Sequence, residues 1–360
     1  MTKKILLRFV LSAVLCSVAA LCLSGCSSTP QPATHSPAEE ITPKSTPEAT
    51  PIMEELYNKL ELLPDGRFER GISLLSQKDH RNGDRYTVLK KFSFYDTEAR
   101  QPYWNLAQWD SGPCLVENMI DAGPGIITDG TSRLFSYDTA SDTMKFRLDT
   151  SAYYQGKPAM QGDYWPHLLI EAPEFTYRRA SDEEKKFYSC GADAIIVSLD
   201  IALCDYKITH NPDDWVEAAQ FLLYLYVKNA DTNDFCWFGL QLFDNRWDLN
   251  GHYIGYDGGK ADASSAMIYS IGSKYVYESA GRSLYKGGQP DAGGDFVHVS
   301  VDIKPYLEDM FRIGKEENYF KCESLDELII NGMNMGWETI GTFDHTMEIR
   351  NLSVTSYIRK

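Results

Sequence analysis

Between residues 86 and 360 the hydrophobic positions recur mostly at every second residue. This is the period of a β-strand with one buried face, whereas a helix repeats every 3.6 residues. The segments with this pattern are rich in β-branched and aromatic residues and are bounded by Gly, Asp, Asn and Pro, as strands are. The predicted strands are 86–95, 133–137, 144–149, 167–171, 194–208, 220–228, 235–244, 266–271, 295–303 and 347–357.

Two segments have helical spacing instead. A Thr-Pro pair precedes apolar residues at positions 52, 56, 60 and 63, which predicts a short helix over 51–63. Leu307, Met310 and Phe311 share one face of a second predicted helix, over 304–314. Ten strands without alternating helices favour an all-β fold, a two-sheet antiparallel β-sandwich of jelly-roll type with these two short helices.

The first 25 residues have the pattern of a secretory signal. Lys3, Lys4 and Arg8 precede an apolar stretch over 9–23, which is short for a membrane span. The stretch ends in Leu23-Ser24-Gly25-Cys26, which resembles the lipobox of bacterial lipoproteins. The resemblance implies that residues 1–25 are removed and that Cys26 is acylated, with palmitate among the chains, and anchors the protein in the bacterial cell membrane, outside the cytoplasm. The alternative is an ordinary signal peptide with a chance Cys.

A polar linker follows over 26–51. Fifteen of the residues at 27–51 are Ser, Thr or Pro, and the one large apolar residue there is Ile41. Such a segment buries too little apolar surface to fold, so it predicts an extended tether. We therefore expect a helix and lead-in over 52–85 and a single sandwich domain over 86–360.

The charge of the chain narrows the choice of partners. The net charge is −16, and removal of residues 1–25 leaves 32 basic against 51 acidic residues, a net charge of −19. Nucleic acid is excluded as a partner because binding it requires a basic surface. Polyanionic glycans are disfavoured by the same repulsion, which leaves neutral partners.

The second face of the predicted central strands carries aromatic rings and short polar side chains rather than Lys and Glu. Sugars bind such surfaces, because their C–H faces stack on rings while polar side chains bond their hydroxyls. The predicted ligand is therefore a neutral oligo- or polysaccharide. The predicted contacts are Tyr224, Tyr226, Trp237, Gln241, Asp200 and His298, with Asp244 and Arg246 at a strand end. The alternative is that loops cover this face and its polar groups bond one another.

A glycan-cleaving enzyme is the second functional hypothesis. A glycoside hydrolase needs two carboxylates in one groove, about 5–5.5 Å apart for retention or about 6.5–9.5 Å for inversion. Its candidate catalytic residues are Glu171, Asp302 and Glu338, with Asp200 as a further carboxylate. A structural pairing of His167 with Glu171, and of Asp244 with Arg246, is the alternative role for these charges.

The end of the chain resembles the last strands of jelly-roll carbohydrate modules, including the concanavalin A-like lectin and glucanase group. The residues concerned are Asn334-Met335-Gly336-Trp337-Glu338 and the segment 347–354. The resemblance implies a carbohydrate module, but the Glu-x-Asp-x-x-Glu strand of laminarinase-type glucanases and the paired motifs of alginate lyases are absent from the sequence.

The sequence predicts no cofactor, with a structural calcium ion as the one candidate. Asp257 with Asp262, and Asp291 with Asp295, lie in Gly-containing loops whose oxygens suit calcium, although such loops are also ordinary turns. Beyond Cys26 the mature chain has five Cys, at 114, 190, 204, 236 and 322, none in a CxxC pair. Because Cys204 and Cys236 fall inside strand patterns, we expect mostly free thiols.

Overall fold

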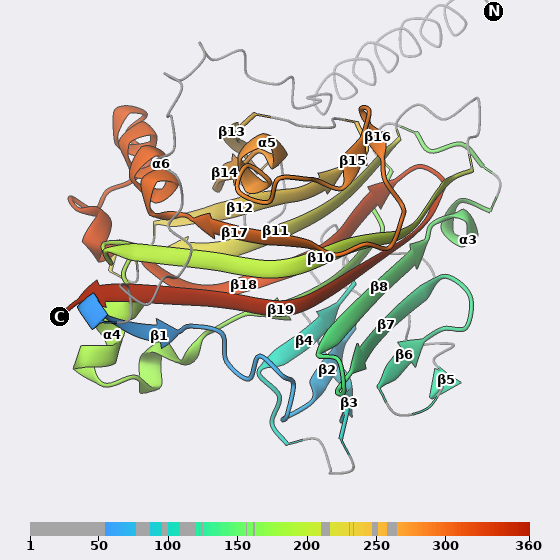
Figure 1. The fold of residues 1–360 in the computed structure, drawn as a ribbon, viewed down its shortest axis with the longest axis horizontal. Coiled ribbons are helices and arrows are strands. Elements are labelled where there is room, and N and C mark those ends of the chain that lie inside the picture. The colour runs from blue at the N-terminus through green and yellow to red at the C-terminus, as the bar shows by residue number, and fades with distance from the viewer. Residues whose placement is uncertain are drawn as a thin grey trace, which may run out of the picture. The chain divides into compact units, whose positions relative to one another are not determined.

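The computed structural model describes residues 55–76, 87–95, 100–108, 120–121, 123, 125–155, 157–160, 163–209, 217–229, 231–232, 234–246, 251–257 and 265–360. The signal segment, Cys26, the tether, Cys114 and Asp262 lie outside these residues. The strands of the described part form two large sheets and a small ribbon (Figure 1). The predicted two-sheet sandwich is therefore confirmed.

The first sheet, sheet A, is entirely antiparallel, and its two longest strands lie side by side (Figure 1). Its strands are, in order, β17 (Val297–Asp302), β10 (Ala194–Ile208), β19 (Phe343–Arg359), β8 (Thr143–Asp149), β7 (Arg133–Asp138), β6 (Ile126–Thr128) and β5 (Ile120–Asp121), while β1 (Tyr57–Glu61) pairs with β19.

The second sheet, sheet B, is mainly antiparallel, with two parallel pairs, β12 with β14 and β2 with β4. Its strands are, in order, β13 (Tyr253–Tyr256), β14 (Met267–Ile271), β12 (Phe235–Asp244), β11 (Ala218–Lys228), β18 (Ile329–Ile340), β9 (His167–Ala172), β4 (Trp104–Ala107), β2 (Ile72–Leu75) and β3 (Val88–Phe92). The ribbon pairs β15 (Tyr285–Lys286) with β16 (Gln289–Pro290).

Helices are few and short. The longest described helix, α6, begins at the predicted residue and continues two residues beyond the predicted end. The α-helices are α3 (Ser151–Tyr154), α4 (Asp182–Tyr188), α5 (Ser273–Val276) and α6 (Lys304–Glu316), and the 3-10 helices are η1 (Thr176–Arg179) and η2 (Leu325–Glu327). Within the described residues, none of these helices has the length and apolar character needed to cross a membrane.

The structure differs from the prediction at the start of the domain. Tyr57–Glu61 form β1 rather than the second half of a helix over 51–63. The Glu61 carboxylate accepts the backbone N–H of Val354 at 3.0 Å and the hydroxyl of Ser353, and Leu56 is exposed. Pairing with the open backbone edge of β19 thus prevails over a local helical pattern, and the lead-in belongs to the sandwich.

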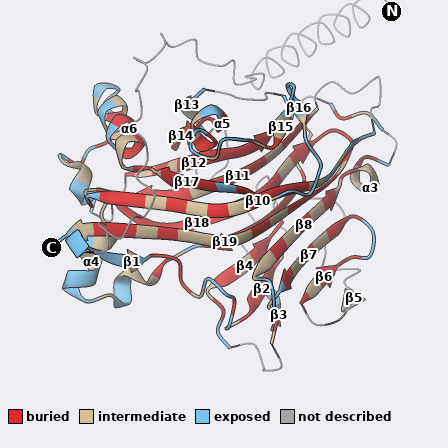
Figure 2. Ribbon diagram, viewed as in Figure 1, coloured by how far each residue is buried: buried red, intermediate tan, exposed pale blue. Residues whose placement is uncertain are grey.

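The core lies between the two sheets and is built from the apolar face that the alternation predicts. Leu199, Val299 and Leu223 are fully buried, and Trp337 packs edge-on against Phe221 with ring centroids 5.0 Å apart. Buried residues follow the strands of both sheets, while α4 is largely exposed (Figure 2). Since each sheet turns one face to this core, each also has a separate outer face.

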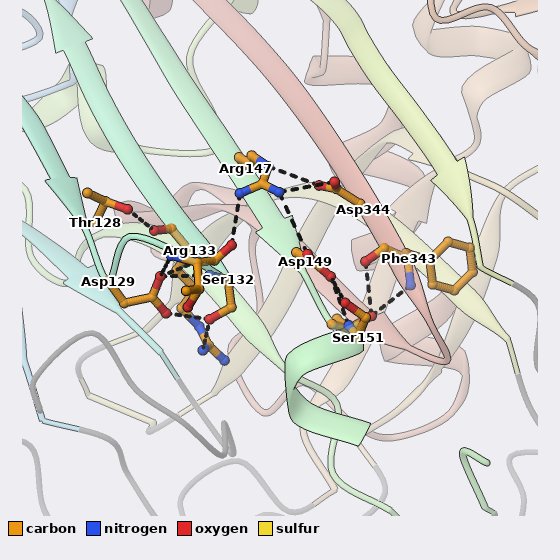
Figure 3. A network of polar contacts seen from close by, with 11 residues as sticks. Thr128, Asp129, Ser132, Arg133, Arg147, Asp149, Ser151, Phe343 and Asp344 are labelled. Carbon is orange, nitrogen blue, oxygen red and sulfur yellow. Dashed lines mark hydrogen bonds and ion pairs between the residues drawn. The ribbon is translucent and has the colours of Figure 1, made fainter. Parts of the chain in front are cut away.

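A polar cluster joins the β6–β7 turn to β8 and β19 (Figure 3). Asp129 accepts the backbone N–H of Thr131 at 2.9 Å, and Arg147 donates to the Thr131 carbonyl and to Asp344, each at 3.0 Å. Burial alone would raise the pKa of Asp129, but the hydrogen bonds it accepts outweigh burial and lower the pKa. The charged side chains of this cluster therefore stabilise the β6–β7 turn.

Candidate functional site

The ligand-binding residues predicted from the sequence fall into two groups on opposite outer faces of the sandwich. Tyr224 and Trp237 lie on β11 and β12 of sheet B, whereas Asp200 and His298 lie on β10 and β17 of sheet A. The prediction of one shared face is wrong. Period two shows which residues of a strand face the same way, but not which sheet the strand joins.

The group on sheet A is held together by its own hydrogen bonds. Asp200 accepts from His298 Nδ1 at 2.7 Å, Arg350 Nε at 3.0 Å and Asn351 Nδ2 at 2.8 Å. Burial alone would raise the pKa of Asp200, but these bonds, with that from His298 first, lower it. Asn351 has a φ of 55° and lies where the β10–β19 register shifts, so Asp200 stabilises a β-bulge.

On the outer face of sheet B, four aromatic side chains from β11 and β12 pack edge to face. The ring centroids of Trp237 lie 4.7 Å from Phe235, 5.0 Å from Tyr226 and 6.1 Å from Tyr224. Tyr224, Phe235 and Trp237 are half-buried, so solvent reaches them. We call Tyr224, Tyr226, Phe235 and Trp237 the aromatic platform.

Two glycines allow the platform rings to lean across neighbouring strands. A Cβ at Gly239, which pairs with Tyr224, would lie 2.5 Å from Tyr224 Cε1, and a Cβ at Gly332 would lie 2.6 Å from Tyr226 Cδ2. Glycine inside a strand often marks such a close approach. Each of these rings therefore lies against the backbone of the neighbouring strand.

Beside the platform, on the same outer face of sheet B, lies a buried polar network. The Tyr226 hydroxyl donates to Glu171 Oε1 at 2.8 Å, and Asn334 Nδ2 donates to the Tyr226 oxygen at 3.3 Å. Glu171 and Asn334 are buried and directly opposed on β9 and β18. This network fixes the position of the Tyr226 ring.

Three of the predicted contacts therefore lie below the surface rather than on it. Tyr226 is 9%, Gln241 5% and Asp244 0% exposed. Asp244 accepts from Arg246 Nε at 2.9 Å and from Gln220 Nε2 at 2.7 Å, which is the structural pairing that the sequence left open. The internal bonding expected of a covered face is therefore present in this part of the outer face.

The predicted catalytic carboxylates do not converge. Asp302 lies on sheet A, where it accepts the backbone N–H groups of Ile195 and Lys304 at 3.3 and 3.1 Å, and burial raises its pKa. Glu171 and Glu338 share the outer face of sheet B, but the β9–β18 register separates them by four residues, which is about 13 Å along a strand.

The residues that face Glu338 across the neighbouring strands are not carboxylates. Its register partners are Gln220 on β11 and His167 on β9, and His167 Nε2 lies 3.6 Å from Glu338 Oε1. Gln220 did not figure in the sequence prediction. Only the pairing register reveals that an amide, and not an acid, stands opposite Glu338.

The described residues include parts of the loops predicted as calcium sites and four of the cysteines predicted as free thiols. Among the described residues, no three His, Cys, Asp or Glu side chains are grouped as metal ligands, and Asp295 lies 3.5 Å from Arg282 Nη1. Cys190, Cys236 and Cys322 are buried free thiols, and Cys204 is a half-buried one.

The comparisons with known proteins find similar folds among solved structures. No protein-family model and no curated sequence matches the chain. A family 12 xyloglucanase from Bacillus licheniformis shares 10% identity at a TM-score of 0.37, covering 67% of this chain and 91% of its own. The endoglucanase cel12A from Rhodothermus marinus shares 6% at 0.35, with 65% and 92% covered.

A family 11 xylanase from Neocallimastix patriciarum shares 10% identity at a TM-score of 0.27, covering 67% of this chain and 89% of its own. The structural neighbours are thus enzymes of glycoside hydrolase families 12 and 11, with which this chain shares little sequence.

Proposed function

We propose that the outer face of sheet B binds a neutral glycan without cleaving it. The observation that carries the proposal is the aromatic platform, in which half-buried Tyr224 leans over Gly239 and packs edge to face with half-buried Trp237. Rings held in this way offer their faces to the C–H groups of a sugar. Gln220 and Glu338 are half-buried and lie on the same outer face of sheet B as the platform. They supply an amide and a carboxylate that can bond the hydroxyl groups of a sugar.

An unpaired donor also supports a polar ligand. The indole Nε1–H of Trp237 is buried and has no hydrogen-bond partner among the described residues. A buried donor without a partner costs about 1–3 kcal/mol. A ligand hydroxyl that reaches this group after a small movement of the ring would recover that free energy.

The arrangement of the acids argues against a retaining hydrolase. Directly opposed residues on neighbouring strands have their Cβ atoms about 4.5–5.5 Å apart, so two opposed acids could bring their carboxyl groups to the about 5–5.5 Å of a retaining hydrolase. The partner of Glu338 at that position is the amide Gln220, whose Nε2 donates to Asp244. An amide cannot serve as the nucleophile or as the base that the reaction needs.

The binding experiment is affinity electrophoresis of the folded domain in gels that contain neutral polysaccharides. We expect retention by at least one of them, and loss of that retention in Trp237→Ala and Tyr224→Ala. The matched control is His298→Ala on sheet A, whose side chain is 67% exposed and which should be retained like the wild type. Retention of Trp237→Ala equal to wild type, or no retention by any gel, would contradict the proposal.

We further infer that the protein is a bacterial lipoprotein, held outside the cytoplasm by acyl chains on Cys26. The proposal is supported by the basic start, the apolar run and the Leu-Ser-Gly-Cys ending. Labelling of cells with a palmitate analogue tests it. We expect label on the wild-type protein in the membrane fraction and none on Cys26→Ser. Equal labelling of the two would contradict the lipid anchor.

A further inference from the structure

Tyr253 lies on β13, the edge strand of sheet B, in the same cross-strand row as Tyr224. Tyr253 pairs with Ser270, Ser270 with Gly239, and Gly239 with Tyr224. Since cross-strand partners share a face, Tyr253 belongs to the outer face that carries the aromatic platform. It was not among the residues predicted from the sequence.

The ring of Tyr253 repeats the arrangement of Tyr224. A Cβ at Gly255 would lie 2.6 Å from the Tyr253 hydroxyl and 2.9 Å from its Cζ, so the ring leans over a glycine of its own strand. Tyr253 as a whole residue is 36% exposed. Tyr253 is thus a second tyrosine supported by a glycine, and more open to solvent than the half-buried Tyr224.

The cross-strand row between the two tyrosines contains small residues, and the Tyr224 ring lies over the first of them, Gly239. Between them in the row stand only Gly239 and Ser270, which have no bulky side chain. Three inter-strand steps of about 4.8 Å place the two strands about 14 Å apart. The Tyr224 ring leans over Gly239 into part of this span, and the row as a whole is longer than a single sugar ring, so a chain of linked sugars can lie along it and contact both rings.

The electrostatic neighbours of Tyr224 and Tyr253 indicate that the two phenols belong to one surface. Burial raises the pKa of Tyr224, and the charges of Glu338 and Tyr253 raise it further. Burial also raises the pKa of Tyr253, with a further rise from Asp257 and a smaller lowering from Arg246. Both phenols therefore lie within electrostatic range of each other and of polar groups on this side of the sheet.

We propose that Tyr253 over Gly255 forms a second stacking position at the edge of sheet B, so that the site takes an oligosaccharide lying across β11, β12, β14 and β13 rather than a single sugar. The inference rests on the proposed glycan binding and adds the length and the path of the ligand. Among the described residues, β13 is the last strand at this edge of sheet B.

Isothermal titration calorimetry with chains of one to six glucose units tests this inference. Two series, the cello- and the malto-oligosaccharides, serve as neutral probes. For a series that binds, we expect the affinity of the wild type to rise with chain length until both rings are reached, and then to level off. Tyr253→Ala should weaken the longer chains about tenfold and leave the shortest bound chain unchanged, while Tyr253→Phe keeps wild-type affinity.

The matched control is Tyr256→Ala, which removes an exposed tyrosine of the same strand from the opposite face, where Tyr256 bonds Glu317. It should bind every chain length like the wild type. Equal loss at all lengths in Tyr253→Ala, or no loss at any, would overturn the second stacking position and leave glycan binding intact. A wild type that binds neither series and is retained by no neutral polysaccharide gel would remove the proposed function and this inference together.

Discussion

Gly239→Ala tests whether the leaning of Tyr224 matters. The added Cβ would lie 2.5 Å from both Tyr224 Cε1 and Ser270 Oγ, which is far inside van der Waals contact. No left-handed φ is recorded for Gly239, so alanine strains no backbone there. The softer neighbour is the tyrosine ring, which must swing away from the sheet.

The expected magnitude follows from the loss of one stacking ring. An aromatic contact is worth about 0.5–1.5 kcal/mol beyond its buried area, so glycan affinity should fall by up to about tenfold. Overpacking costs about 1–3 kcal/mol of stability, and we expect the low end because the ring can move. Titration calorimetry with the glycan that binds the wild type measures the first effect, and urea unfolding the second.

The control for this prediction is Gly293→Ala, whose added Cβ would meet only Asp291 Oδ1, at 3.8 Å. This variant should bind and unfold like the wild type. If Gly239→Ala binds the glycan as tightly as the wild type while Tyr224→Ala does not, the orientation of the ring is irrelevant and the reasoning from Gly239 is refuted.

Three further predictions concern buried groups and the amide of Gln220. Tyr226→Phe leaves the buried Glu171 carboxylate without the hydroxyl that donates to it at 2.8 Å, and urea unfolding should show a loss of about 1–3 kcal/mol; an unchanged midpoint would contradict the network. Burial lowers the pKa of His345 to about 3 and that of His252 to about 4. Because both depressed values lie below the unfolded value near 6.5, the unfolded state binds more protons and stability falls as the pH drops below about 6.5. His345→Phe should remove up to about 1.4 kcal/mol per pH unit from that slope between pH 6.5 and 5, and an unchanged slope in urea titrations would count against a buried neutral His345. Gln220→Glu places a second carboxylate beside Asp244, which Gln220 now bonds at 2.7 Å, and should lower thermal stability, whereas Gln220→Met should bind glycan more weakly with a smaller effect on the melting temperature.

The strands were predictable where strong alternation and tertiary pairing agree. β10 and β12 have the predicted bounds, Ala194–Ile208 and Phe235–Asp244, because their inner faces are continuous apolar rows that only a sheet buries. β18 was missed as a full strand, since Asn331, Gly332, Asn334 and Gly336 interrupt the apolar pattern. Its neighbours β9 and β11 supply the pairing that these residues do not encode locally.

The sequence predicted the type of residue in the candidate site but not which residues lie together. Tyr224 and Trp237 carry an aromatic signal that the sequence displays directly, but Asp200 and His298 belong to the other sheet. That assignment depends on long-range pairing, such as Asp200 with His298 and Arg350, which periodicity does not contain. One usable signal was overlooked, namely glycines at 239 and 255 within strongly β-forming runs.

The most direct measurement of the central claim is a ¹H–¹⁵N NMR titration of the indole N–H signals with the retained glycan. The chain has seven Trp, and the signal that is missing from Trp237→Phe identifies Trp237. The account predicts that this signal shifts on addition of the glycan as its unpaired N–H gains a partner. If the glycan binds and the Trp237 signal stays in place, the outer face of sheet B is not the binding surface.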